Sequence, residues 1–210
     1  MIPKNFPWTD VPLRELPFVI LDLETTGLEP PSAAITEIAM ISTTNGNEEV
    51  FETLINPGTP IPPEISRLTG ITDQMVQNKP RIPEVLPFVA SILDGGLFVS
   101  HNVPFDWSFL SHAFSTHLGR PLKMPSLCTL HMARRFLNLG SNRLCAVIDY
   151  FGETLKEAHR AIGDTMAVKA VLFHFLEFLE GKGIKTGGDL VRNNVLFLDA
   201  PPVQRRYSRS

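Results

Sequence analysis

The sequence predicts an α/β fold in which helices cover a mixed β-sheet. Residues 18–21 form a continuous apolar run, which is typical of a strand buried on both faces of a sheet. Asn45-Gly46-Asn47 is a strong hairpin signal between two strand-like segments, so the early strands are expected to be antiparallel neighbours. Apolar residues with helical spacing across residues 164–180 predict a well-buried helix.

Length and composition fit an ordinary globular domain. With 210 residues, of which 43% are hydrophobic and 20% charged, the chain can bury a sizeable core and is too apolar to be disordered. No apolar run reaches the roughly eighteen residues that span a bilayer, and residues 1–10 lack the apolar core of a signal peptide. Cys128 and Cys145 have apolar neighbours and no metal-ligand spacing, which suggests buried free thiols. We therefore expect a cytoplasmic protein that spans no membrane.

The first part of the chain supplies an arm and three strands. Residues 1–16 carry three prolines and little periodicity, so we expect an arm that lies over the domain. The first strand is followed by two more strand-like segments at residues 33–44 and 49–56. Glu37 interrupts the second of these, and we assign it to the solvent face.

Short helices and a fourth strand occupy the middle of the chain. Helical segments are expected at residues 63–68, 72–77 and 85–93. Residues 97–100 form a short apolar strand and lead into a helix that Asn102 can cap, with Pro104 tolerated in its first turn.

The remaining chain adds a fifth strand and further helices. Residues 127–137 begin as a strand and continue as a helix, and residues 144–151 form another helix before the long one. Four glycines then mark the end of regular structure, and a mildly basic tail follows. Its apolar stretch at residues 194–198 fits packing on its own domain better than a clamp-binding peptide. The chain therefore divides into residues 1–16, 17–182 and 183–210.

Two acids end the first strand. Because side chains alternate along a strand, Asp22 and Glu24 project from the same face. Two close carboxylates in a poorly solvated place repel each other, so either their pKa values rise or a cation lies between them. Thr25, Thr26 and Gly27 then form a polar turn where main-chain groups can approach a ligand. Taken alone, the two acids fit a helix or turn cap and a surface residue better than they fit a functional site.

Two later segments carry further candidates. Asp106 shares a helix face with Leu110, so its side chain is expected to point into the protein. An acid there either interacts favourably with the positive N-terminus of the helix or is a third carboxylate at the site of Asp22 and Glu24. His159 and Asp164 are five residues apart, about 140° around a continuous helix, so both serve one site only if His159 precedes the helix. Gly163 is compatible with such a break.

The three segments resemble a known family. DLETTG, HNVPFD and HRAIGD, in this order, look like the three motifs of the DnaQ-like exonuclease superfamily, in the subgroup with His five residues before the last Asp. The subgroup with Tyr is disfavoured because Arg160 stands where that Tyr would be. The resemblance covers about residues 18–179. It includes the segment LTGITDQMV, which is similar to the corresponding region of bacterial polymerase III epsilon proofreading subunits.

This resemblance implies a fold, a chemistry and a set of site residues. The fold is the three-layer ribonuclease H-like one, here with five strands, and residues 17–182 are its exonuclease domain. The implied ligands of two Mg²⁺ or Mn²⁺ ions are Asp22, Glu24, Asp106 and Asp164, and carboxylates suit such hard ions. His159 is the implied general base. The implied contacts to the terminal nucleotide are Thr25, Thr26, Gly27 and Leu28.

The implied reaction is release of nucleoside monophosphates from a DNA 3′ end, with single strands preferred. A net charge of −3 argues against a long basic groove for duplex nucleic acid and permits a site that grips a chain end. RNA is an alternative substrate, and a non-enzymatic binding module is disfavoured because all five functional positions are filled. A DNA polymerase subunit is a candidate partner, and the oligomeric state is open.

Five residues in and beside the second motif stay outside the catalytic set. Cap and turn formation explains Asn102, and His101 is a weaker candidate of the same kind. Helical spacing assigns Phe105 and Phe109 to the core, whereas Trp107 is either core or a stacking platform for bases.

Overall fold

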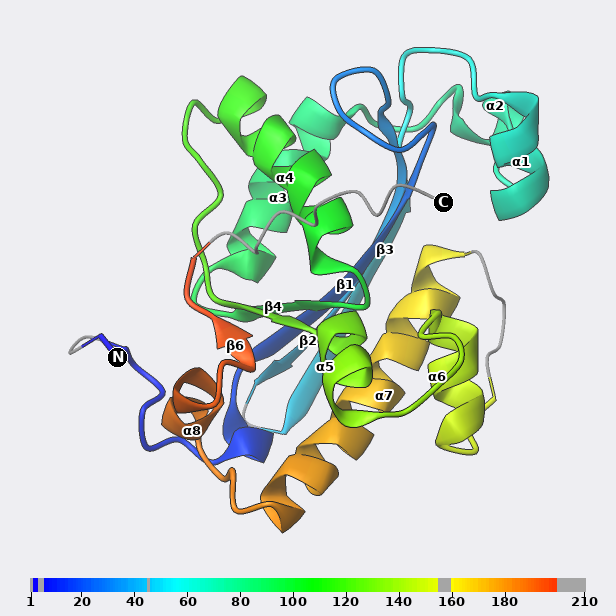
Figure 1. Ribbon diagram of the computed structural model, residues 1–210. Coiled ribbons are helices and arrows are strands. Elements are labelled where there is room, and N and C mark those ends of the chain that lie inside the picture. Colours follow the sequence, from blue (N-terminus) through cyan, green and yellow to red (C-terminus); the bar gives the residue numbers. More distant parts are fainter. Residues whose placement is uncertain (1, 4–5, 45, 155–159, 200–210) are drawn as a thin grey trace.

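A computed structural model describes residues 2–3, 6–44, 46–154 and 160–199, and Figure 1 shows one sheet between layers of helices. In this part of the chain the sheet has six strands, in the order β3-β2-β1-β4-β5-β6. They are β1 (Phe18–Thr25), β2 (Ile35–Thr44), β3 (Asn47–Leu54), β4 (Leu97–Ser100), β5 (Ser126–Cys128) and β6 (Leu196–Phe197). β1, β2 and β3 are antiparallel neighbours, as predicted, whereas β1, β4 and β5 run parallel.

The sheet has one strand more than the five expected. β6 pairs antiparallel with β5, so that Leu196 lies opposite Leu127. Two residues are too few to show the alternation of a strand, and the sequence pattern therefore did not reveal β6.

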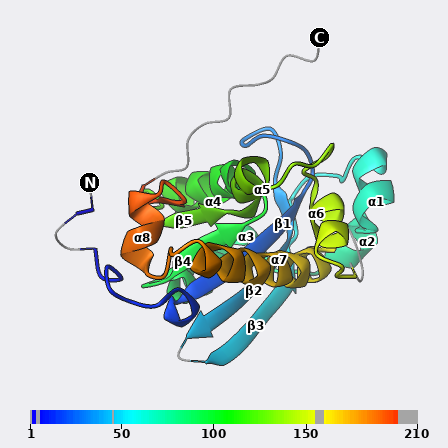
Figure 2. The same cartoon turned by 60° about the horizontal axis from the view of Figure 1, so that its bottom comes forward.

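Helices cover both faces of the sheet. They are the 3₁₀ turn η1 (Leu13–Glu15), α1 (Pro63–Thr69), α2 (Asp73–Val76), α3 (Ile82–Leu93), α4 (Val103–His117), α5 (Thr129–Phe136), α6 (Leu144–Tyr150), α7 (Ala161–Gly181) and α8 (Gly187–Arg192). One face packs against α3 and α4, and the other packs against α5, α6, α7 and α8. Figure 2 shows α7 lying along its face of the sheet. The arrangement is the expected three-layer α/β sandwich.

The alternation along β1 decides which way the acids point. Phe18 and Ile20 pack in the core beneath α7, whereas Val19 and Leu21 pack in the core beneath α3 and α4. Because successive side chains of a strand point to opposite faces, Asp22 continues the row of Phe18 and Ile20. The acids of β1 are therefore directed to the face that α7 covers.

Burial decides the expectations about the two cysteines and about three aromatic residues of α4. Cys128 is buried as expected, but Cys145 is exposed on α6, because that short helix turns its second residue to solvent. Phe109 lies in the core and Phe105 packs against it, as predicted. Trp107 is also buried, with its ring 5.6 Å from that of Phe98, so it is a core residue and not a platform for bases.

The arm and the closing segment of the chain meet on the domain. Leu13 of η1 is buried, and its backbone N–H donates to the carbonyl of Lys185. Pro12 forms an isolated antiparallel bridge with Thr186, just before α8. Within the described residues, none of the helices combines the length and apolar character that crossing a membrane requires.

Candidate active site

Three of the predicted acids meet between β1 and α7. One carboxylate oxygen from each of Asp22, Glu24 and Asp164 lies within 4.8 Å of the other two. Asp22 and Glu24 come from the same face of β1, and Asp164 comes from the first turn of α7. Residues separated by 140 positions in the sequence thus form one cluster of hard oxygen ligands, which is the donor type that Mg²⁺ and Mn²⁺ prefer.

Asp106 lies near this cluster, although it is not one of the three acids whose oxygens lie within 4.8 Å of one another. It lies in the first turn of α4, is only 3% exposed, and its Oδ1 atom has no hydrogen-bond partner within the described structure. Its negative charge raises the pKa of Asp22, second only to the effect of burial, so the two carboxylates are close. A buried carboxylate oxygen without a donor is costly unless a cation or a proton satisfies it. Asp106 therefore fits a metal ligand better than a helix-end residue.

Burial and mutual repulsion shift the pKa values of these acids upward. Burial is the main reason that the pKa of Glu24 rises to about 8, and the charge of Asp164 adds to it. Burial also raises the pKa of Asp106 to about 7 and holds the pKa of Asp22 well above its usual value. Without a cation the cluster retains protons near neutral pH, whereas a divalent cation favours the ionised carboxylates.

The assignment of Glu37 to the solvent face is wrong. Its side chain is 0% exposed and points to the same side of the sheet as Glu24, its register partner on β1. Arg160 Nη2 donates to Glu37 Oε1 at 2.6 Å, and the backbone N–H of Ala161 donates to Oε2 at 2.9 Å. Glu37 is therefore buried because it binds the start of α7.

The Glu37 contacts explain how Asp164 is placed. Arg160 is the residue that precedes α7, and Ala161 is its first residue. A carboxylate at this end also interacts favourably with the helix dipole. With the helix start fixed against β2, the next turn brings Asp164 to the acids of β1. The sequence signal was an acid inside the apolar run of residues 35–41, the same signal that singled out Asp22.

The turn after β1 is held by its own side chains. The hydroxyl of Thr25 donates to the carbonyl of Gly27 at 2.6 Å, and the hydroxyl of Thr26 accepts from the backbone N–H of Ala34 at 2.9 Å. The backbone N–H of Thr26 also donates to the carbonyl of Ala34, so these hydrogen bonds fix the conformation of the turn. Leu28 is 80% exposed, so its side chain is accessible to a ligand. The predicted general base, His159, lies outside the described residues.

Comparison with known proteins gives the family. The sequence pattern of the RNase T exonuclease family matches residues 19–172. The DNA polymerase III epsilon subunit of Aquifex aeolicus is 34% identical over 179 residues, which cover 84% of this chain and 88% of that protein. The chain belongs to the DnaQ-like 3′–5′ exonuclease superfamily.

Two much longer proteins contain a segment that is similar to this chain. The PolC-type DNA polymerase III of Thermotoga maritima is 36% identical over 168 residues, which cover 80% of this chain and 12% of that protein. A Mycobacterium tuberculosis protein named as a bifunctional exonuclease/endonuclease is 38% identical over 196 residues, or 88% of this chain and 30% of that protein. The chain thus spans less than a third of the length of these two relatives.

Solved structures agree with the fold of a DnaQ-like exonuclease. Exonuclease X in complex with 5′-overhanging duplex DNA aligns with a TM-score of 0.62 and 25% identity, covering 79% of this chain and 93% of that one. The predicted ribonuclease H-like architecture is therefore confirmed.

Proposed function

We propose that the protein is a metal-dependent 3′–5′ exonuclease that releases nucleoside 5′-monophosphates from single-stranded DNA. The observation that carries the proposal is the meeting of Asp22, Glu24 and Asp164 within 4.8 Å, beside the unpaired oxygen of buried Asp106. DNA is favoured over RNA because relatives that are 34–36% identical include DNA polymerase III proteins. Two ions, Mg²⁺ or Mn²⁺, are the cofactors that this set of acids would hold.

Each site residue has a defined role in the proposed reaction. Asp22, Glu24, Asp106 and Asp164 would hold the ions, which when bound stabilise the negative charge on the attacking and departing oxygens. His159 takes the proton from the attacking water, a task suited to a group that titrates near neutral pH.

The turn after β1 would orient the substrate. The turn formed by Thr25, Thr26 and Gly27 would bind the terminal nucleotide through its backbone and side chains, and the exposed side chain of Leu28 would pack against its base. Holding the end of the strand in one orientation brings the scissile bond to the acids and accounts for release of one nucleotide at a time.

The biological setting is part of the same proposal. The domain at residues 17–182 would proofread beside a DNA polymerase catalytic subunit or act in repair, as the epsilon and PolC-type relatives suggest. Free Cys128 and Cys145 fit a reducing compartment, so we assign the protein to the cytoplasm.

The direct test is release of nucleotides from 3′-labelled strands. We expect wild-type protein to shorten single-stranded DNA in Mg²⁺ or Mn²⁺, to stop in chelator, and to lose about 10³-fold or more of its rate in Asp22→Ala. The exposed acid Asp149, changed to Ala, is the matched control and should leave the rate unchanged. Release that resists chelator, or full activity of Asp22→Ala, contradicts the metal mechanism. Faster release from RNA of the same sequence would reassign the substrate.

A further inference from the structure

A cavity lined mainly by polar side chains lies between the start of α4, α5 and the start of α6. It has a volume of about 380 Å³ and is lined by His101, Asn102, Arg134, Asn142 and Arg143, with two leucines completing the wall. Two guanidinium groups face this space, and none of the lining residues is acidic. In a chain with a net charge of −3, this is a local concentration of positive charge. We call these five polar residues the arginine pocket.

The arginine pocket and the set of four acids both include a residue from the start of α4. Asn102 directly precedes α4, and Asp106 follows in the first turn of that helix. At roughly 1.5 Å per residue, the two positions are about 6 Å apart along the helix axis. In Figure 1 the loop that follows β1 lies above the start of α7, whereas α6 lies below it. If the 3′ end of a nucleic-acid strand binds at that loop, the rest of the strand would run past the acid cluster toward the arginine pocket.

His101 gives the pocket a fixed shape. Its Nε2–H donates to the carbonyl of Asn142 at 2.9 Å, and its Nδ1 atom lies 3.0 Å from the Thr129 hydroxyl. Burial is the main reason that the pKa of His101 is lowered, so the ring stays neutral. Because both ring nitrogens are engaged, His101 binds the start of α4 to the loop before α6 and thereby places Arg143.

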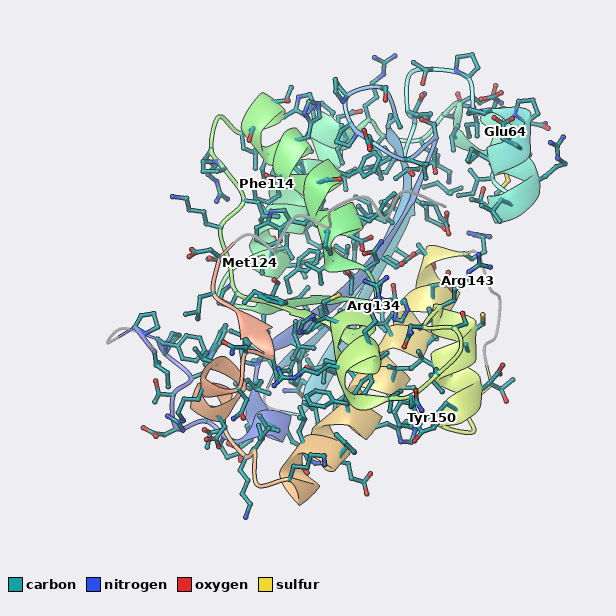
Figure 3. The ribbon with its side chains drawn as sticks, viewed as in Figure 1. Glu64, Phe114, Met124, Arg134, Arg143 and Tyr150 are labelled. Carbon is teal, nitrogen blue, oxygen red and sulfur yellow. The ribbon has the colours of Figure 1, made fainter. Side chains whose placement is uncertain are left out.

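The two arginines are available for a ligand. Both are exposed, and no ion pair joins either of them to a carboxylate in the described part of the chain. By contrast, Arg14, Arg160 and Arg192 each pair with an acid. Figure 3 shows Arg134 on α5 and Arg143 at the start of α6. A planar guanidinium donates two parallel hydrogen bonds to phosphate oxygens, which makes arginine pairs suitable for phosphate binding.

We propose that the arginine pocket binds a backbone phosphate of the substrate strand on the 5′ side of the bond that is hydrolysed. This inference rests on the proposed exonuclease function. The ligand is an internal phosphodiester, which carries one negative charge and no base identity, so the contact positions the strand without selecting sequence. The pocket also offsets the repulsion between the approaching strand and the four acids. A substrate with only one phosphate cannot occupy the acid cluster and the arginine pocket at the same time.

The test compares substrates with and without internal phosphates. The p-nitrophenyl ester of thymidine 5′-monophosphate contains one phosphate, and single-stranded DNA of about ten nucleotides contains several. For Arg134→Ala and Arg143→Ala, we expect KM for the DNA to rise about tenfold each, the usual effect of losing a charged hydrogen bond. Hydrolysis of the ester should stay unchanged. Lys123→Ala removes an exposed positive charge outside the pocket and is the matched control.

Two further measurements separate phosphate binding from a general effect of charge. The slope of log KM against log salt should decrease by about 0.7 for each lost phosphate contact. Replacing one internal phosphate by a neutral methylphosphonate should raise KM for the wild type and add nothing in the double variant Arg134→Ala/Arg143→Ala. Such non-additivity identifies a shared interaction.

The outcomes distinguish the two proposals. Unchanged KM for DNA in the arginine variants, or equal losses on DNA and on the ester, overturns the arginine pocket while leaving the exonuclease in place. A methylphosphonate effect that persists in the double variant overturns it as well. Wild-type protein that hydrolyses neither substrate in Mg²⁺ or Mn²⁺ overturns the exonuclease function itself.

Discussion

Asp106 combines three properties that rarely occur together in a residue without a ligand. It is buried, it is acidic, and its Oδ1 atom lacks a donor in the described structure. Sequence spacing could place it on the inward side of a helix, but only the assembled fold shows that it raises the pKa of Asp22. Charged residues are almost never fully buried unless they are paired or bind a metal. We therefore attribute the unfavourable burial of the Asp106 carboxylate to its role in the proposed metal site.

His159 is predicted to transfer a proton without holding an ion. His159→Ala should lower the turnover rate by about 10²- to 10⁴-fold, which is the usual contribution of a general base. Binding of Mn²⁺, measured by calorimetry, should persist because the carboxylates are intact. His112→Ala, an exposed histidine on α4, should change neither quantity. Loss of Mn²⁺ binding in His159→Ala would instead make this residue a metal ligand.

Among the elements, the contact between β2 and α7 is the one that local sequence pattern could not reveal. Glu37 and Arg160 are 123 residues apart, so no periodicity connects them. β6 was missed for a different reason, since two residues are too few to show the alternation of a strand. In contrast, β1 and α7 are long and strongly patterned, and their buried faces and their acids followed from alternation and helical spacing. The sequence therefore predicted features that repeat within one strand or helix, whereas contacts between distant elements could be identified only from the three-dimensional structure.

The β2–α7 contact should stabilise the protein measurably. Arg160→Ala leaves Glu37 buried without its charge partner and should lower the free energy of unfolding by about 3 kcal/mol. Glu37→Gln/Arg160→Ala should lose less than the sum of the single changes, because the second change removes the uncompensated charge. Urea unfolding measures each variant.

Lys169→Ala is the control on the same helix. Lys169 pairs with Glu48 near the surface, and breaking such a pair costs only about 0–1 kcal/mol. If Arg160→Ala were as mild as Lys169→Ala, the buried pair would not be what fixes the start of α7.

For the whole molecule, the acid cluster links stability to pH and to divalent cations. The pKa of Glu24 rises from 4.5 to about 8 on folding, and that of Asp106 rises from 3.8 to about 7. Between pH 4 and pH 8 the unfolded chain therefore binds fewer protons at these groups than the folded protein does. Stability must then fall as pH rises through this range. A bound cation reverses the effect, because it favours the ionised carboxylates and binds only the folded state.

Urea unfolding at pH 5 and pH 8 measures this linkage. In chelator, the free energy of unfolding should be lower at pH 8 by about 2 kcal/mol or more. Saturating Mg²⁺ should restore most of the difference at pH 8 and have little effect at pH 5, where protons compete for the same oxygens. Glu24→Gln should flatten the dependence in chelator, since its amide does not titrate, and Glu153→Gln, an exposed control, should not. Stability that rises with pH in chelator, or a Mg²⁺ effect that is equal at both pH values, would mean that these carboxylates are not crowded in the folded protein.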